Sequence, residues 1–177
     1  PFLRHERRAG EKHVNASRAL PPIEARVRLK VDLAAVAANF RRIAKKVFPA
    51  RVMAVLKADA YGLGMLPIAR AVVAAGADRI GVAELKEAAA LLPHVRVPVQ
   101  VLSGLLPGEV EPAVALGVVC PVTDFETARR LSKAATKRGV RIRIHFKLDT
   151  GMGRMGIPVE GAEAVIRRCV ELPGLRA

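Results

Sequence analysis

The chain has 177 residues, 51% of them hydrophobic, which is enough for a folded domain or a large part of one and excludes an intrinsically disordered protein. No apolar run approaches the roughly 18 uncharged residues of a membrane span, so we expect a soluble, cytoplasmic protein with no membrane association. The net charge of +14 raises nucleic acid as a partner, but the charges are scattered and one Tyr, five Phe and no Trp offer little base stacking. We therefore expect no nucleic-acid binding.

Residues 1–25 differ from the rest of the chain. They are rich in Arg and Lys, show little periodicity and contain the break Pro21-Pro22. They lack the apolar segment of a secretory signal, and Glu6 and Glu11 argue against a mitochondrial presequence. We expect residues 1–25 to be a basic, flexible tail and residues 26–177 to be the folded part.

Strand-like and helix-like segments alternate after the tail. A period-two pattern predicts a strand at 26–31, and Asp32 is expected to cap a helix that continues to residue 47. Further strands are predicted at 52–56, 79–83, 97–102, 118–122 and 141–147. The predicted helices between and after them cover 65–75, 84–92, 107–116, 124–138 and 159–172. Cys120 and Cys169 lie in apolar contexts without metal-ligand spacing, which predicts core cysteines in a reducing compartment and no metal site.

This alternation predicts βαβ units and a parallel sheet. Counted from residue 52, the chain holds about five of the eight units of a (β/α)8 barrel, or nearly all of an open doubly wound sheet. The segment 141–147 favours the barrel, because its basic residues share one face and would look into a solvated interior or a site. An edge strand with one wet face is the alternative explanation of that segment.

Lys57 ends the apolar run 52–56 and is followed at once by Ala-Asp-Ala-Tyr-Gly. Burial lowers the pKa of a lysine, and a partly neutral lysine can form a Schiff base with an aldehyde. The position therefore predicts a reactive amine at the end of a buried strand, and a solvated surface lysine is the alternative. Gly62 and Gly64 indicate a turn directly after it.

A glycine cluster, Gly151, Gly153 and Gly156, satisfies the dinucleotide pattern G-x-G-x-x-G after the strand 141–147. Pro158 delays the following helix beyond the motif, so a pyrophosphate would not meet a helix N-terminus. The motif also follows the fifth strand rather than the first. We therefore do not expect a nicotinamide cofactor.

Two motifs together resemble a known family. The segment 55–64, Val-Leu-Lys-Ala-Asp-Ala-Tyr-Gly-Leu-Gly, resembles the pyridoxal-phosphate lysine motif of bacterial alanine racemases, and 146–156 resembles their second signature. The resemblance covers about 23–177 and implies an α/β chain that forms the N-terminal part of an incomplete (β/α)8 TIM-type barrel. It implies a pyridoxal 5'-phosphate-dependent isomerase that interconverts L-alanine and D-alanine, the latter for peptidoglycan, and a homodimer in the full-length protein.

The resemblance also implies roles for four residues. Lys57 would hold the cofactor covalently and serve as one of two catalytic bases. Tyr61 would bind the cofactor phosphate, and Arg154 would contact the cofactor and hold the substrate carboxylate. Lys147 matches a lysine that is carbamylated in many members of the family, and a carbamate there would pair with Arg154. Leu63 departs from the histidine that is common at that position, which should change loop packing only.

The remaining family residues, among them a tyrosine base from the partner subunit, would lie beyond Ala177. We therefore expect the isolated chain to be inactive. Two alternatives stay open from the sequence. One is another pyridoxal-phosphate racemase or decarboxylase of the same fold, and the other is a non-catalytic, truncated remnant.

Overall fold

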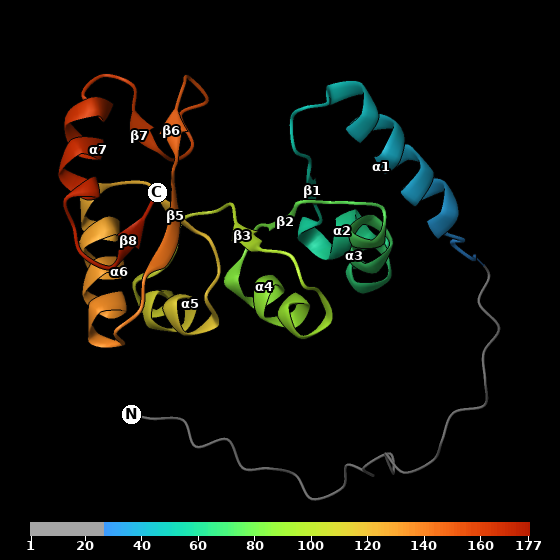
Figure 1. Cartoon of the computed structure of the whole chain (residues 1–177), viewed down its shortest axis with the longest axis horizontal. Coiled ribbons are helices and arrows are strands. Elements are labelled where there is room, and N and C mark those ends of the chain that lie inside the picture. Colours follow the sequence, from blue (N-terminus) through green and yellow to red (C-terminus); the bar gives the residue numbers. More distant parts are fainter. Residues whose placement is uncertain (1–26) are drawn as a thin grey trace, which may run out of the picture. The chain divides into compact units, whose positions relative to one another are not determined.

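The computed structural model describes residues 27–177, of which Val31–Ala177 form one compact unit. The predicted tail, 1–25, lies outside the described residues. Strands and helices alternate along the unit (Figure 1). The strands are β1 (Met53–Val55), β2 (Arg79–Val82), β3 (Val99–Val101), β4 (Cys120–Val122), β5 (Ile142–Phe146), β6 (Leu148–Asp149), β7 (Ile157–Pro158) and β8 (Leu175–Arg176).

Six of these strands form one parallel array in chain order. β1 pairs with β2 and β2 with β3, while β4 pairs with β5 and β5 with β8, all parallel. A bridge between Gln100 and Val119 joins the two halves, with the Val119 N–H donating to the Val99 carbonyl at 2.9 Å. Within residues 27–177 no pairing links β8 back to β1, so the array is open.

Parallel strands that pair in sequence order, each followed by a helix, are the arrangement of a (β/α)8 barrel and not of a doubly wound sheet, whose strand order reverses. The predicted incomplete barrel is therefore confirmed. The structure adds a sixth strand, β8, which the sequence analysis missed because only two residues, Leu175 and Arg176, are paired.

The helices are α1 (Leu33–Val47), α2 (Lys57–Gly62), α3 (Met65–Ala74), α4 (Leu85–Leu91), α5 (Val110–Leu116), α6 (Phe125–Lys137) and α7 (Ala162–Val170), with single 3-10 turns η1 (Leu92–His94) and η2 (Pro107–Glu109). Asp32 caps α1 as predicted, accepting from the N–H groups of Ala34 and Ala35. Asp124 caps α6 by accepting from the Thr127 N–H at 2.7 Å. None of the helices in 27–177 combines the length and the hydrophobicity needed to cross a membrane.

The core lies between the strands and these helices. Alternate strand residues such as Ile80, Val99 and Ile144 are almost fully buried there, together with Ala88 and Leu131 of the helices. Both cysteines are free and buried, as predicted for core residues, and burial raises the pKa of the Cys120 thiol to about 12. The opposite face of the strands carries the basic side chains described below.

Two details differ from the sequence predictions. The strand expected at 26–31 is wrong for its described part, because 27–32 pair with no strand and are largely exposed. A period-two pattern shows which face a strand could bury but does not supply a partner. The apolar stripe of α1 is also only partly covered: Phe40 is buried, but Ile43 is 55% exposed and Val47 41% exposed.

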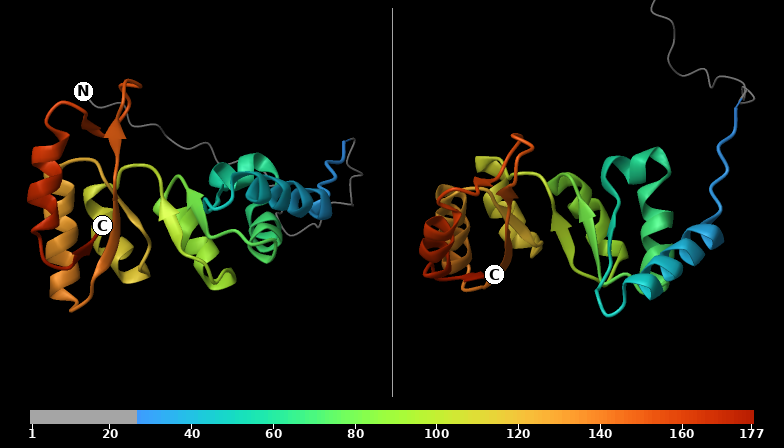
Figure 2. Two further views of the ribbon diagram at one scale, coloured as in Figure 1. Left: turned by 45° about the horizontal axis from the view of Figure 1, so that its top comes forward. Right: turned by 90° about the horizontal axis from the view of Figure 1, so that it is seen from above.

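A short excursion follows β5. β6 and β7 pair in parallel and enclose the glycine cluster, and this loop projects beyond the end of β5 (Figures 1 and 2). The chain then enters α7 and returns to the sheet as β8.

Candidate active site

The site residues implied by the sequence lie in the loops at the carboxyl ends of the parallel strands. Lys57 follows β1, and Lys147 follows β5. Tyr61 lies in the same segment as Lys57, and Arg154 lies in the β6–β7 loop. In (β/α)8 barrels this end of the strands carries the active site, and the opposite end serves stability.

The segment after β1 has an unusual backbone. Ala58, Asp59, Ala60 and Tyr61 are all in the left-handed helical region, with φ between 52° and 59°. L-residues other than glycine lose roughly 1–2 kcal/mol each in this conformation relative to the right-handed one. Lys57 and Tyr61 are therefore about one turn apart on a short left-handed helix, α2, which places them on the same side of it.

Backbone hydrogen bonds close this left-handed turn. The Ala60 N–H donates to the Leu56 carbonyl at 2.9 Å, and the Gly64 N–H donates to the Asp59 carbonyl at 3.0 Å. Leu56 and Ala60 are buried, whereas Ala58 is exposed. Gly62 and Gly64 have φ of +82° and +92°, so the predicted turn at these glycines is confirmed.

Two side-chain carboxylates also hold the turn. Asp59 Oδ1 accepts from the Met65 N–H at 2.7 Å and so links the turn to the start of α3. Glu87, in the first turn of α4, accepts from the Ala58 N–H at 2.6 Å through Oε1. Its other oxygen, Oε2, accepts from the N–H groups of Ala83 at 2.8 Å and Glu84 at 3.1 Å.

The loop after β5 reaches its conformation with glycines. Gly151, Gly153 and Gly156 have φ of +126°, +69° and +133°. A Cβ at Gly156 would lie 2.7 Å from the backbone nitrogen of Asp149, so only glycine fits there. The Ile157 N–H donates to the Lys147 carbonyl at 2.8 Å, which closes the loop at its base.

The same geometry excludes the dinucleotide interpretation of the glycine pattern. Asp149 Oδ1 accepts from the N–H groups of Gly151 and Gly153, both at 3.0 Å, so the amides that would hold a phosphate already have a carboxylate partner. These backbone hydrogen bonds, with that from Gly153 the strongest, lower the pKa of Asp149 below 3.8. The next helix, α7, begins only at Ala162.

The four implied residues remain accessible. Lys57 and Lys147 are half-buried, Arg154 is exposed and Tyr61 is 62% exposed. Within residues 27–177 no salt bridge engages the two lysines or Arg154, and no side-chain hydrogen bond joins any of the four residues to another. The structure thus places Lys57 and Tyr61 on one turn and Lys147 and Arg154 in the segment after β5, and no side-chain hydrogen bond or salt bridge joins the two pairs among the described residues.

This donor set fits pyridoxal phosphate. An amine can bind the aldehyde, and a phenol and a guanidinium can bind the phosphate and phenolic oxygens. An anionic group would also give the uncompensated cations at this edge a partner. No group of three or more His, Cys, Asp or Glu residues in the described part of the chain could hold a metal ion.

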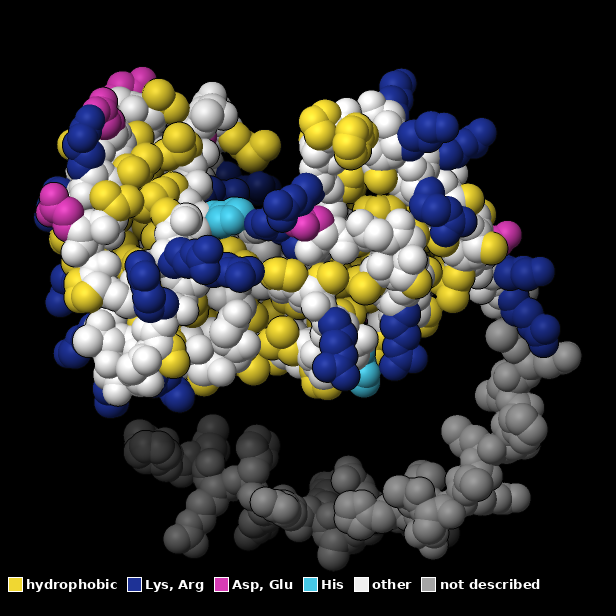
Figure 3. Space-filling model, viewed as in Figure 1, with side chains coloured by type: hydrophobic (Ala, Val, Ile, Leu, Met, Phe, Trp, Pro, Cys, Tyr) yellow, Lys and Arg dark blue, Asp and Glu magenta, His cyan; other side chains and the backbone are white. Residues whose placement is uncertain are grey.

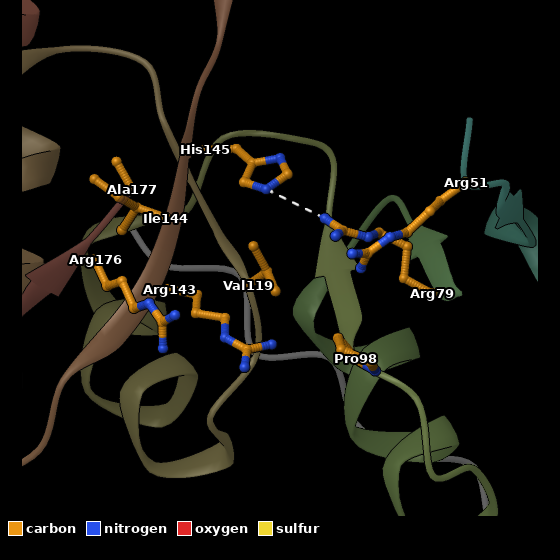
Figure 4. Close-up of a pocket in the computed structure, with 9 residues that line it drawn as sticks. All are labelled: Arg51, Arg79, Pro98, Val119, Arg143, Ile144, His145, Arg176 and Ala177. Atoms are coloured by element: carbon orange, nitrogen blue, oxygen red, sulfur yellow. Dashed lines mark hydrogen bonds between the residues drawn. The ribbon is translucent and has the colours of Figure 1, made fainter. Parts of the chain in front are cut away.

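A separate basic cavity lies on the inner face of the strands, toward their amino ends (Figure 4). It has a volume of about 280 Å³ and is lined by Arg51, Arg79, Arg143, His145 and Arg176, among others. Arg79 Nη1 lies 3.3 Å from His145 Nε2 across the interior. Burial lowers the pKa of His145, and the positive charge of Arg79 lowers it further, by a smaller amount.

The cavity shows which way the basic residues of the segment 141–147 point, for which the sequence left two explanations. Arg143 and His145 do line the interior of the open barrel, while the alternate residues Ile142 and Ile144 are buried. Lys and Arg side chains also surround a histidine near the middle of the face shown in Figure 3. None of Lys57, Tyr61, Lys147 and Arg154 lines this cavity.

Glu87 and the left-handed turn were missed by the sequence analysis. Glu87 three residues after Glu84 fits a capping box, which would have indicated the start of α4 but not the contact with Ala58, 29 residues away. Of Ala58 to Tyr61, only Asp59 is of a residue type that is enriched at positive φ, and one such residue does not indicate four consecutive left-handed residues.

Comparison with known proteins identifies the family. The family model described as "Alanine racemase, N-terminal domain" matches residues 31–177. An alanine racemase from Syntrophobacter fumaroxidans is 38% identical over 150 residues, which cover 84% of this chain and 40% of the relative. The chain thus spans about 40% of the length of the curated relatives it matches.

Solved structures agree with this result. The alanine racemase from Streptomyces coelicolor A3(2) superimposes with a TM-score of 0.76 at 36% identity, over 83% of this chain and 41% of that one. An alanine racemase from Bartonella henselae with covalently bound pyridoxal phosphate gives a TM-score of 0.74 at 28% identity, over 82% of this chain and 42% of that one. The chain therefore belongs to the alanine racemase N-terminal domain family.

Proposed function

We propose that this chain is the cofactor-lysine portion of a pyridoxal 5'-phosphate-dependent racemase that interconverts L-alanine and D-alanine. The observation that carries the proposal is the grouping of Lys57, Tyr61, Lys147 and Arg154 in the loops at the carboxyl edge of the parallel strands, with no salt bridge to either lysine or Arg154 within 27–177. These cations are available for an anionic cofactor and for the substrate carboxylate. Family membership supports the reaction type.

Each residue has a proposed role in that reaction. Pyridoxal phosphate, when bound, supplies the electron-withdrawing system that makes the α-proton of an amino acid removable. Lys57 Nζ would hold the cofactor through its aldehyde and would take or return the α-proton of the substrate on one face. Tyr61 would donate its phenolic O–H to the cofactor phosphate, and the Arg154 guanidinium would hold the substrate carboxylate.

Racemisation also needs a base on the opposite face of the α-carbon. A single amine held on one turn can reach one face only, because the proton must be transferred over hydrogen-bond distance. We propose that the second base comes from outside residues 27–177, as in a homodimer whose partner subunit contributes to the site. The same proposal places the protein in the cytoplasm, where D-alanine is made for peptidoglycan.

Lys147 is proposed to be carbamylated. An unmodified lysine and Arg154 in the same loop repel each other, whereas a carbamate would form an ion pair with the guanidinium and fix its orientation. Mass spectrometry of gently handled protein should show an added carboxyl group at Lys147. Replacing Lys147 by Ala should lower activity, and added chloride or another small anion should restore part of it.

The central test is chemical trapping on the complete gene product. Borohydride reduction after incubation with pyridoxal phosphate, followed by peptide mapping, should label Lys57. Lys57→Ala should abolish both the label and the D/L-alanine turnover, with a loss of at least about 10³-fold in rate, as expected for removal of a group that acts as both nucleophile and base. Lys86→Ala, which changes an exposed lysine of α4, serves as the control and should leave both unchanged. A label at any other lysine would overturn the assignment.

A further inference from the structure

Lys57 is held from both sides by contacts with the β2–α4 segment. The Leu56 N–H, just before Lys57, donates to the Gly81 carbonyl at 2.8 Å. The Ala58 N–H, just after it, donates to Glu87 Oε1 at 2.6 Å. The residues before and after the lysine are therefore tied through their N–H groups to one neighbouring strand and helix.

Glu87 makes this connection with both carboxylate oxygens. Oε2 binds the N–H groups of Ala83 and Glu84, where β2 ends and α4 begins, and Oε1 binds Ala58. Hydrogen bonds to a charged acceptor are about twice as strong as those between neutral groups. The α4 N-terminus also favours a negative charge at this position, which keeps Glu87 in place.

The left-handed turn needs such a contact. Four consecutive non-glycine residues, Ala58 to Tyr61, adopt a conformation that isolated L-residues avoid. Such conformations persist only where surrounding contacts determine them, and they cluster at functional sites. Among the side-chain hydrogen bonds that hold the turn, the one that Glu87 accepts involves Ala58, the residue directly after Lys57.

We propose that Glu87 is a positioning residue for the cofactor lysine: it fixes the left-handed turn after β1 and so presents Lys57 and Tyr61 in one preset arrangement before the cofactor binds. This inference rests on the proposed role of Lys57. It extends that role to a residue of another helix, which touches neither cofactor nor substrate in the assignment above.

Glu87→Gln is the sharpest variant. A glutamine side chain has one acceptor oxygen and one NH2 group, so it cannot accept from Ala58 on one side and from Ala83 and Glu84 on the other. The oxygen should stay with the two donors at the start of α4, which leaves the NH2 group facing the Ala58 N–H. The turn is then released while the helix cap is kept.

Glu109→Gln is the matched control. Glu109 also lies three residues after the capped position, and its Oε2 accepts from the Leu106 N–H at 2.8 Å. It makes no hydrogen bond to the segment 57–64 among the described residues. The two variants therefore make the same chemical change at the start of two helices. Only the carboxylate at the start of α4 accepts a hydrogen bond from the left-handed turn.

The first measurement is hydrogen exchange of the complete, cofactor-free gene product. In Glu87→Gln, amides 58–61 should exchange about tenfold faster or more, the effect expected from losing one charge-assisted hydrogen bond, while amides of α6 keep their rates. Glu109→Gln should leave amides 58–61 at the wild-type rate. Equal rates in the wild type and Glu87→Gln, or equal acceleration by both variants, would overturn the inference.

The second measurement is cofactor affinity, followed by the absorbance of lysine-bound pyridoxal phosphate. Its Kd should rise about tenfold in Glu87→Gln and stay unchanged in Glu109→Gln, because a released turn must be ordered during binding. Adding Ala58→Gly, which relaxes the left-handed strain, should recover part of the loss, and it also provides a second background if the single variant folds poorly. An unchanged Kd in Glu87→Gln would contradict the role.

The two proposals fail in different ways. If trapping labels another lysine but the exchange result holds, the proposed function is wrong and Glu87 still fixes the turn. If Lys57 is labelled but exchange and affinity do not respond to Glu87→Gln, the function stands and the positioning role is wrong.

Discussion

The loop after β1 and the loop after β5 both contain glycines at positive φ, but the β1 loop also places four consecutive non-glycine residues there. In the β5 loop, glycines occupy the positions at 151, 153 and 156, and a carboxylate of the same loop, Asp149, binds the amides. In the β1 loop, residues 58–61 are alanine, aspartate, alanine and tyrosine, and a carboxylate from α4, Glu87, binds the backbone.

The difference shows where the information for each loop resides. In the β5 loop, glycine allows the required positive φ angles without help from other parts of the structure, because it has no Cβ that would clash. The β1 loop lacks that freedom at four positions and depends on tertiary contacts to a helix about 30 residues further along. A loop that carries side chains such as Lys57 and Tyr61 at its turn cannot replace them with glycine, and the surrounding structure must stabilise it instead.

The largest effect should come from closing the space that the glycine loop requires. In Gly156→Ala the new Cβ would meet backbone atoms 2.7–2.9 Å away at a φ of +133°, so we expect unfolding to become easier by about 2–4 kcal/mol. Thermal or urea unfolding of the complete gene product measures this. Gly108→Ala, at an open position without positive φ, is the control and should change stability little.

An intermediate effect tests the strain in the β1 loop. Ala58→Gly should stabilise the protein by up to about 1 kcal/mol, because glycine removes the penalty of a left-handed residue at an exposed position. The same change in a right-handed helix, Ala89→Gly on the exposed side of α4, should destabilise it by about 1 kcal/mol. Urea midpoints of the two variants should move in opposite directions. A destabilised Ala58→Gly would show that the turn is not strained.

The smallest effect concerns pH. Because backbone N–H groups lower the pKa of Asp149 in the folded protein, its ionised form stabilises the β5 loop above pH 3.8, and this contribution is lost as the pH falls through the lowered pKa. We expect nuclear magnetic resonance titration of the Asp149 carboxyl group to give a pKa below 3.8. Asp149→Asn should remove this pH dependence of amide exchange at Gly151 and Gly153, whereas exchange in the β1 loop should not follow this titration.

Much of the fold could be read from the sequence. Apolar runs such as 52–56 and 118–122 contain β1 and β4, and the caps Asp32 and Asp124 mark the starts of α1 and α6. The alternating pattern at 141–147 correctly placed Arg143 and His145 toward the barrel interior. The strand expected at 26–31 was wrong in its described part, and β8 was missed, because strand pairing depends on a neighbour that periodicity does not reveal.

Some features of the candidate site could likewise be predicted from the sequence, and others could not. The sequence by itself determined the alternation of strands and helices, the reactive-lysine motif at Lys57 and the glycine-dependent loop that contains Arg154, because periodicity and the absence of a Cβ are local properties. Only the tertiary structure decided that Ala58 to Tyr61 turn left-handed and that Glu87 is their partner. Those residues prefer other conformations when alone, and the contact that overrides the preference joins positions 29 residues apart.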